Sequence, residues 1–333
     1  MNRRIWLVLF LILVFGFTFY DGLRYYFSDK MSVLRLGKRL WRQVEVRREF
    51  VIFHNLFIPG VVECDKFGDI YVLDYGDVSV KKFSASGKFI IKFGIGRGQG
   101  PGELLNPTDI KIDDRLNLWI CDAGNVKVSV FDNRGKLYKE FKLSAVPLRV
   151  SPLQDGGFIV QEMMEFKRYD ANGRGVFGFK DDFIFKRFDN PLYWSSFLIS
   201  DSAFLYCVLY DLGYLICINL GDGSVKYRVK VMDAPPPPEI VVREFRGAKV
   251  AKLVRKSNSL TVGFNVLDDM IFLHTVEVDK KDDFTVIDVY SSVDGRYLYS
   301  FKIPGKFRRG YFDGRYYYGV GDTIVSKFEV LFR

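Results

Sequence analysis

The sequence predicts an all-β fold, a six-bladed β-propeller preceded by one short hydrophobic segment. Two observations predict it: a repeat in the first half of the chain and a composition suited to strands. Of the 333 residues, 17% are aromatic, with 32 Phe and 19 Tyr, and 30 are Gly. Aromatic side chains fit a pleated, half-buried surface, and glycines suit the tight turns that many short strands need.

The repeat relates two segments of the chain at a constant offset of 48 residues. Each unit contains four short apolar runs separated by turn residues, which is the pattern of short antiparallel strands. A four-stranded unit of this length is one propeller blade, and it buries both faces only by packing against neighbouring blades. The matched segments are 59–65 with 107–113, 69–74 with 117–122, and 80–83 with 128–131.

The later units repeat the pattern less strictly. The third opens at Pro147, the fifth contains residues 270–274 and the last spans 314–328. The last unit has room for only two or three strands, whereas the strand-like segment 44–57 has no unit of its own. Because exposed sheet edges invite aggregation, we expect this N-terminal segment to join the C-terminal blade and close a ring of six.

The N-terminus predicts a membrane segment. Arg3 and Arg4 precede an uninterrupted apolar run of 16 residues, 5–20, longer than a typical signal-peptide core and shorter than the roughly 20 residues that cross a bilayer. Three interpretations stay open: an uncleaved anchor, a cleaved signal peptide and a buried core helix. The lack of a good small-x-small cleavage pattern favours the anchor. Its apolar residues include Ile5, Trp6, Leu9, Leu13, Phe17 and Tyr20.

We expect three parts along the chain: an anchor or signal segment (1–30), a linker (31–43) and the propeller (44–333). A cationic-then-apolar start is how exported chains usually begin, so we expect a single-pass protein with an extracytoplasmic propeller, periplasmic or extracellular. Arg24 and Lys30 follow the apolar run, so the positive-inside rule does not decide the orientation by itself.

The net charge of +9 does not predict a nucleic-acid partner, because Lys and Arg alternate with Asp and Glu along the chain. The densest basic stretch, 243–256, has two interpretations: a solvated face, or a surface that contacts anionic lipid headgroups. Residues 235–238 form a stiff polyproline loop. Residues 239–260 are expected to form a short helix or an elaborated blade edge outside the ring.

Short motifs in the first two units carry a family resemblance. The patterns are Pro-x-x-Ile-x-x-Asp (107–113), Asn-Leu-Trp-Ile-x-Asp (117–122) and Phe-Asp-x-x-Gly-Lys (131–136), with a glycine-rich linker at 93–103. They resemble the NHL-repeat (NHL/TolB-like) six-bladed propellers of prokaryotes. The resemblance implies the fold and an exported or membrane-tethered protein. It also implies that some relatives are enzymes, either metal-dependent lyases or lactone hydrolases.

The four cysteines show neither a CxxC motif nor zinc-site spacing with His. Cys207 and Cys217 flank a turn at 210–213, and a hairpin centred on Leu212 would place them directly opposite each other. Two interpretations stay open: a cross-strand disulfide, or buried free thiols, which are a common state of Cys. Cys64 and Cys121 lie inside strand patterns and are expected in the core.

The glycine-rich run 94–102 is predicted to be an inter-blade linker, because a phosphate-binding loop would need Gly-Lys-Ser/Thr and a following helix. Arg97, Gln99 and Glu103 at its tip are the candidate partner-binding residues.

The repeated aspartates, Asp65/Asp113 and Asp74/Asp122, are interpreted as turn-capping groups, since a catalytic carboxylate is rarely needed in every blade. A Ca²⁺ ion in the central channel stays open as an alternative, because oxygen ligands abound. The only two histidines, His54 and His274, lie in apolar contexts and are expected to be packed. No catalytic, cofactor-binding or metal-binding residue is assigned.

Two classes of function follow. The first is a non-catalytic, membrane-tethered interaction module that presents the loops of the ring to a protein, peptide or glycan. The second is a hydrolase or lyase of the gluconolactonase-like propeller type that uses carboxylates and a divalent metal ion at the channel mouth. The aromatic content favours binding, because Tyr and Trp concentrate at interface hot spots.

Overall fold

The computed structural model describes residues 38–179, 181–188, 190–245, 248–254, 259–277 and 283–333. The predicted anchor residues, Ile5 to Tyr20 among them, lie outside the described residues. Within the described ranges, no helix is long and apolar enough to cross a membrane.

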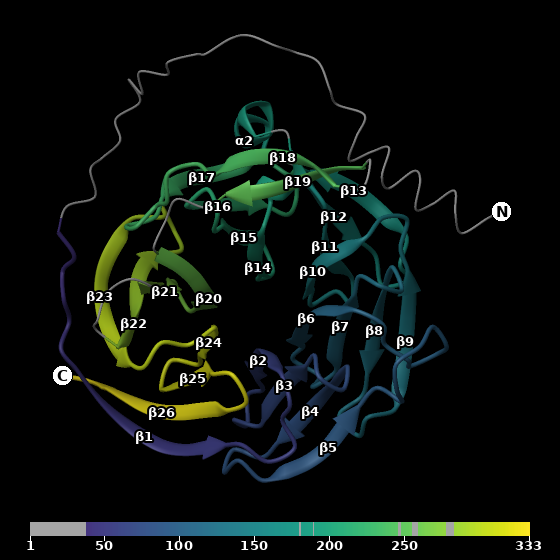
Figure 1. Ribbon diagram of the computed structural model, residues 1–333, viewed down its shortest axis with the longest axis horizontal. Coiled ribbons are helices and arrows are strands. Elements are labelled where there is room, and N and C mark those ends of the chain that lie inside the picture. Colours follow the sequence, from purple (N-terminus) through teal and green to yellow (C-terminus); the bar gives the residue numbers. More distant parts are fainter. Residues whose placement is uncertain (1–37, 180, 189, 246–247, 255–258, 278–282) are drawn as a thin grey trace.

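The described residues form six four-stranded sheets arranged as a ring, and one additional two-stranded sheet (Figure 1). The six-bladed β-propeller predicted from the repeat is therefore confirmed. Blades 1 to 5 are antiparallel meanders whose first strand lies innermost, whereas the outermost strand of blade 6 comes from the N-terminal part of the chain (Figure 1). Six inner strands therefore surround the centre of the ring, which we call the central channel.

The first three blades follow the repeat closely. Blade 1 contains β2 (Pro59–Cys64), β3 (Ile70–Asp74), β4 (Ser79–Phe83) and β5 (Phe89–Phe93). Blade 2 contains β6 (Pro107–Ile112), β7 (Leu118–Asp122), β8 (Lys127–Phe131) and β9 (Leu137–Lys142). Blade 3 contains β10 (Pro147–Pro152), β11 (Phe158–Glu162), β12 (Glu165–Tyr169) and β13 (Gly175–Phe179).

The last three blades carry the insertions and the ring closure. Blade 4 contains β14 (Ser196–Ser200), β15 (Phe204–Leu209), β16 (Tyr214–Asn219) and β17 (Val225–Lys230). Blade 5 contains β20 (Ser259–Leu267), β21 (Met270–Glu277), β22 (Phe284–Ser291) and β23 (Tyr297–Pro304). Blade 6 contains β24 (Arg309–Phe312), β25 (Tyr316–Val320), β26 (Val325–Phe332) and the N-terminal β1 (Val44–Ile52).

The N-terminal strand closes the ring as predicted. β1 pairs antiparallel with β26, from Val44 opposite Phe332 to Ile52 opposite Val325, with one irregularity between Arg48 and Phe50. Residues 38–43, which belong to the predicted linker, lie along blade 5: Trp41 forms a parallel bridge with Ser300, and the Arg42 N–H donates to the Ser300 carbonyl at 2.8 Å.

The core lies between the blades. The middle strands β3, β7 and β11 are buried along their whole length, whereas the outer strand β5 is mostly exposed. One cluster joins Tyr71 and Leu73 of blade 1 to Ile110 and Leu118 of blade 2. Each sheet therefore buries both faces against its neighbours, which is why a single blade would not be stable by itself.

The repeated aspartates hold the connections between blades. Asp74 accepts hydrogen bonds from the backbone N–H groups of Phe57 and Ile58, both at 2.8 Å. Asp122 repeats this arrangement with Leu105 and Asn106, at 3.0 and 2.9 Å. These contacts tie each incoming linker to the end of a middle strand and confirm the turn-capping interpretation of this pair.

Two insertions interrupt the meander. A short helix α2 (Asp182–Arg187) and a 3-10 turn η1 (Pro191–Tyr193) separate blades 3 and 4. Between blades 4 and 5, β18 (Glu239–Phe245) and β19 (Ala248–Val254) form a hairpin that pairs only with itself within the described residues. For this part of 239–260 the helical alternative is wrong. β20, the inner strand of blade 5, begins at Ser259.

Of the two interpretations of Cys207 and Cys217, the cross-strand disulfide is wrong and the buried free thiols are confirmed. Leu209 pairs with Tyr214, so the hairpin is symmetric about the Asp211–Leu212 bond rather than about Leu212. Cys207 therefore lies opposite Ile216, and Cys217 lies opposite Tyr206. Adjacent positions of a strand point to opposite faces, so the two thiols enter different core clusters. All four cysteines are free and buried.

Candidate functional site

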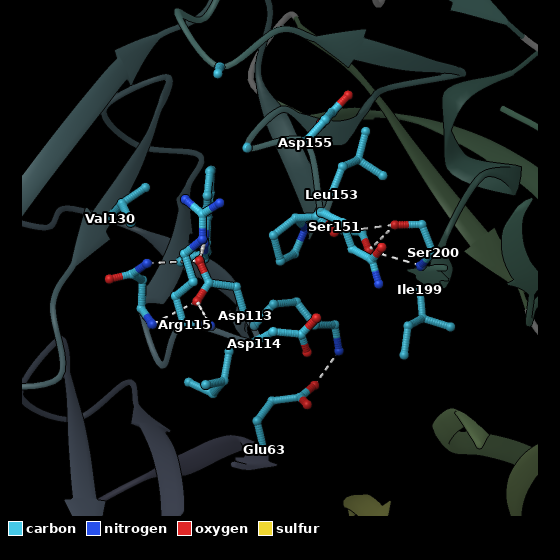
Figure 2. Close-up of a pocket in the computed structure, with 18 of the residues that line it drawn as sticks. Glu63, Asp113, Asp114, Arg115, Val130, Ser151, Leu153, Asp155, Ile199 and Ser200 are labelled. Carbon is cyan, nitrogen blue, oxygen red and sulfur yellow. Dashed lines mark hydrogen bonds and ion pairs between the residues drawn. The ribbon is translucent and has the colours of Figure 1, made fainter. Parts of the chain in front are cut away.

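The candidate site is a cavity of about 570 Å³ at one mouth of the central channel. The C-terminal ends of four inner strands meet there: β2, β6, β10 and β14 contribute Cys64, Ile112, Pro152 and Ser200. Figure 2 shows Asp113, Asp114 and Arg115 on one side of the cavity, Ser151 and Ser200 on the other, and Glu63 below them. Its size is within the usual range for a small-ligand site.

The turn after β6 forms one wall of the cavity. Both carboxylate oxygens of Asp113 in this turn already accept hydrogen bonds. Asp113 Oδ1 accepts from the backbone N–H groups of Arg115 and Asn117 at 2.9 and 2.8 Å. Its Oδ2 accepts from the Trp119 indole N–H at 2.9 Å. Asp65 holds the equivalent turn of blade 1 through Phe67 N–H. The turn-capping interpretation is confirmed for this second pair as well.

Two further aspartates around the cavity, Asp155 and Asp201, are held in the same way. Asp155 accepts from Gly157 N–H at 2.8 Å and pairs with Arg168 at 2.8 Å. Asp201 accepts from Ala203 and Phe204 N–H, both at 2.7 Å. Carboxylates committed to backbone groups fix the shape of the wall but offer few free oxygens to a metal ion or a reacting atom.

The channel floor contains a buried ion pair, Glu63 with Lys111 (Figure 2). Burial raises the pKa of the Glu63 carboxyl to about 7, against the opposing effect of the Lys111 ammonium. A carboxyl group that titrates near neutral pH in a cavity is a candidate for proton transfer, although structural ion pairs are shifted in the same way.

The remaining lining groups are suited to contact a ligand. The Ser151 and Ser200 hydroxyls are 2.7 Å apart. The side chains of Asp114 and Gln154 make no hydrogen bond or ion pair within the described part of the chain. Tyr138 is 65% exposed and lies at the rim with Trp119. Free polar groups beside one exposed aromatic ring, that of Tyr138, can bind a polar ligand without further chemistry.

The predicted partner-binding residues do not line this cavity. Arg97 and Gln99 are exposed on the linker between blades 1 and 2. Glu103 turns back onto the same loop, where its carboxylate accepts from Gly100 N–H at 2.7 Å. The carbonyl of Gly98 also accepts from the Asn125 side chain at 2.8 Å. Glu103 therefore shapes its own loop, and a contact of Arg97 or Gln99 with a partner stays a prediction.

The sequence did contain a signal for the ion pair on the channel floor. Glu63 and Lys111 occupy equivalent positions of the repeat, 48 residues apart. Equivalent positions of adjacent blades are neighbours around the channel, so opposite charges there predict a contact. The cavity residues from blades 3 and 4 gave no such signal, because these units follow the repeat less closely.

The two histidines differ from each other. His274 is completely buried, as expected. The expectation that His54 is packed is wrong, because it is exposed in the connection between β1 and β2. Within the described ranges, no three His, Cys, Asp or Glu side chains are grouped so that they could hold a metal ion.

Comparisons with known proteins support the fold. The model of the DUF5128 family, described as a 6-bladed beta-propeller, matches residues 58–183, which cover blades 1 to 3. No curated protein matches the chain. The match supports a six-bladed propeller and does not distinguish the NHL-repeat type.

Solved structures of similar shape have little sequence in common with this chain. A member of the DUF4221 family from Bacteroides vulgatus is 10% identical, with a TM-score of 0.58 over 88% of this chain and 99% of that one. Virginiamycin B lyase from Staphylococcus aureus is 11% identical, with a TM-score of 0.55 over 86% and 99%. The Cps50 (Swd1) beta-propeller domain from Myceliophteria thermophila is 12% identical, with a TM-score of 0.53 over 86% and 99%. At these identities the likeness shows the fold alone.

Proposed function

We propose that this chain is a membrane-tethered, non-catalytic binding module that takes a peptide or glycan segment of its partner into the channel-mouth cavity. The observation that carries the proposal is the combination of rigid walls and free polar groups in one cavity. Asp113, Asp155 and Asp201 hold the turns of three blades. A preformed wall reduces the ordering cost of binding.

The groups left for a partner are the carboxylate of Asp114, the amide of Gln154 and the ring of Tyr138. A carboxylate and an amide can accept from and donate to hydroxyl or peptide groups. An exposed aromatic ring supplies contact area at a low cost in side-chain entropy. This set suits a peptide or a glycan better than an apolar small molecule.

The test is binding of the full chain to peptide and glycan arrays, with a cavity variant beside it. We expect the double variant Asp114→Ala/Tyr138→Ala to weaken binding of the captured ligands at least tenfold. Phe67→Ala is the matched control, because Phe67 is 68% exposed and lies outside the cavity lining. If no ligand shows this dependence on the cavity variant, the proposal is wrong.

The tether and the extracytoplasmic location form a second part of the proposal. They are supported by the cationic start and the apolar run at 5–20. We expect the full chain to sediment with membranes and to retain its N-terminus, as measured by the intact mass, and a chain without residues 1–30 to remain soluble. A mature chain that begins after the apolar run would replace the anchor by a cleaved signal peptide.

A hydrolase or lyase is the second candidate, and the observation that favours it is Glu63. Its pKa of about 7 would allow proton transfer near neutral pH. A screen of lactones and esters with and without divalent ions would test it. A genuine activity should fall roughly 100-fold or more in Glu63→Gln, whereas Glu140→Gln, outside the cavity, should leave it unchanged.

A further inference from the structure

The opposite mouth of the channel contains two arginines that converge on one aromatic ring. The guanidinium carbon of Arg149 lies 5.7 Å from the centroid of the Phe197 ring, and that of Arg309 lies 5.0 Å from it. These residues stand near the beginnings of β10, β14 and β24, whereas the cavity described above lies at the other ends of the inner strands. Blade 5 separates blades 4 and 6, so Arg309 reaches Phe197 across the channel.

Arg149 is held in place by carbonyl oxygens alone. Its Nε donates to the Ser196 carbonyl at 2.8 Å, and its Nη1 donates to the Thr108 and Leu148 carbonyls at 3.0 and 2.9 Å. No hydrogen bond of Nη2 is found among the described residues. The guanidinium is therefore oriented, keeps one N–H edge free and has no carboxylate partner in an ion pair.

The side chain of Arg309 has fewer polar contacts than that of Arg149. Within the described part of the chain its side chain makes no hydrogen bond and no ion pair, only the contact with Phe197. Burial, followed by the neighbouring charge of Arg149, lowers the pKa of Arg309 below its ordinary value. A guanidinium that is partly withdrawn from water beside a like charge is unfavourable unless an anion compensates it.

One carboxylate faces the two arginines from the channel wall. Asp109 accepts from the Val150 N–H at 3.2 Å, and its charge acts on both arginines. It forms no ion pair with either of them. These three groups together carry a net charge of +1. The charge of Lys111, which is paired with Glu63, also acts on Arg149. The excess of positive charge suits an anionic ligand.

A second aromatic side chain, Tyr75, lies near the two arginines. The ring of Tyr75 lies against β2, where a methyl group on Gly60 would be 2.0 Å from it. Tyr75 is 40% exposed, and the charges of Arg149 and Arg309 both act on its hydroxyl group.

We propose that Arg149 and Arg309 form a binding site for the carboxylate group of a ligand whose apolar part packs on Phe197 and Tyr75. The guanidinium of Arg309, which makes no hydrogen bond among the described residues, matches the planar, two-oxygen geometry of a carboxylate. Arg149 adds the N–H groups of its Nη2, because its Nε and Nη1 already donate to carbonyl oxygens. The site lies at the opposite mouth from the cavity of the proposed function and does not depend on it.

The test is calorimetric titration of the purified full chain with benzoate, and with benzamide as its neutral analogue of the same shape. We expect benzoate to bind and benzamide to bind at least tenfold more weakly. Arg309→Gln and Arg149→Lys should each weaken benzoate binding at least tenfold, the second because a lysine has three N–H donors and, if it kept the three carbonyl contacts of Arg149, would have none left for the ligand. Arg308→Gln is the matched control, because Arg308 is exposed and donates to the Gly321 and Asp322 carbonyls.

Inorganic phosphate serves as the competing oxyanion. We expect it to displace benzoate poorly, because phosphate is tetrahedral rather than planar and has no apolar part to pack on Phe197 and Tyr75. Equal binding of benzoate and benzamide, benzoate binding that survives both arginine variants, or phosphate binding tighter than benzoate would each overturn the proposal. The cavity variant Asp114→Ala/Tyr138→Ala should leave benzoate binding unchanged, so failure at one mouth is distinguishable from failure at the other.

Discussion

The guanidinium of Arg39 holds the carboxylate of Asp288 with two hydrogen bonds, Nε to Oδ1 at 2.8 Å and Nη2 to Oδ2 at 3.0 Å. Asp288 lies in β22 with its side chain only 1% exposed, and the Ser300 hydroxyl also donates to it. The two partners are 249 residues apart. The chain is thus fastened to blade 5 before β1 enters blade 6, and the ring is closed at two adjacent places.

This relationship predicts a large loss of stability in Arg39→Met. Removal of Arg39 leaves the buried Asp288 carboxylate without its countercharge and with only the Ser300 hydroxyl as a donor, which costs about 3 kcal/mol. The free energy of unfolding of the full chain in urea measures it. Arg47→Met is the matched control, because the Arg47–Glu45 pair is exposed on β1 and should change stability little. Equal effects of the two variants would contradict the prediction.

His274 predicts that stability falls with acid. Burial lowers its pKa from an ordinary value near 6.5 to about 3, and neither ring nitrogen has a hydrogen-bond partner among the described residues. Between these values the unfolded chain binds a proton that the folded chain does not. The contribution of neutral His274 to the free energy of unfolding is therefore fully present above about pH 6.5. Below that pH the free energy of unfolding falls by about 1.4 kcal/mol per pH unit towards pH 3.

The measurement compares unfolding at about pH 7 and about pH 5 in the parent chain and in His274→Gln. In the variant the free energy of unfolding should fall less steeply with acid, by roughly 1.4 kcal/mol less per pH unit than in the parent chain. His54→Gln, which changes the exposed histidine, should keep the dependence of the parent. The same slope in all three proteins would show that His274 is not the group that titrates.

Because all four cysteines are buried and free, we predict that their thiols react slowly in the folded chain and that no disulfide forms. Burial raises the pKa of Cys217 to about 11 and raises the pKa values of Cys64, Cys121 and Cys207 as well. A thiol is the unreactive form, so Ellman's reagent should react slowly with the folded chain. In guanidinium chloride without reductant all four should react at once. Two reactive thiols instead of four would indicate a disulfide.

We predict that the hairpin β18–β19 can be deleted with little effect on the stability of the ring. Glu239 and Val254 are cross-strand partners at its base, so two glycines can join the flanking chain after the hairpin is removed. Because the hairpin pairs with no blade within the described residues, Tm should change by less than about 3 °C. Deletion of residues 325–333, which removes β26, is the contrasting variant and should unfold blade 6. Comparable losses would show that the hairpin supports the ring.

The sequence alone determined the architecture, because the repeat is a local property that each blade carries. Turn aspartates such as Asp113, the four-strand meander and the closing strand at 44–52 can all be recognised from spacing and apolar alternation. The equivalence of Glu63 and Lys111 would also have predicted one contact inside the channel. The NHL-type motifs, the anchor and the location remain predictions from sequence.

Only the tertiary structure decided which side chains meet at the two mouths of the channel. Arg149, Phe197 and Arg309 come from three blades and from units in which the repeat is weak, so no spacing along the chain relates them. The centre of the hairpin that contains Cys207 lies half a residue from the position expected from the sequence. The pairing is therefore displaced by one residue, and Cys207 and Cys217 lie on opposite faces of the sheet. Contacts across a ring depend on closure and register, and these are settled when all six blades pack together.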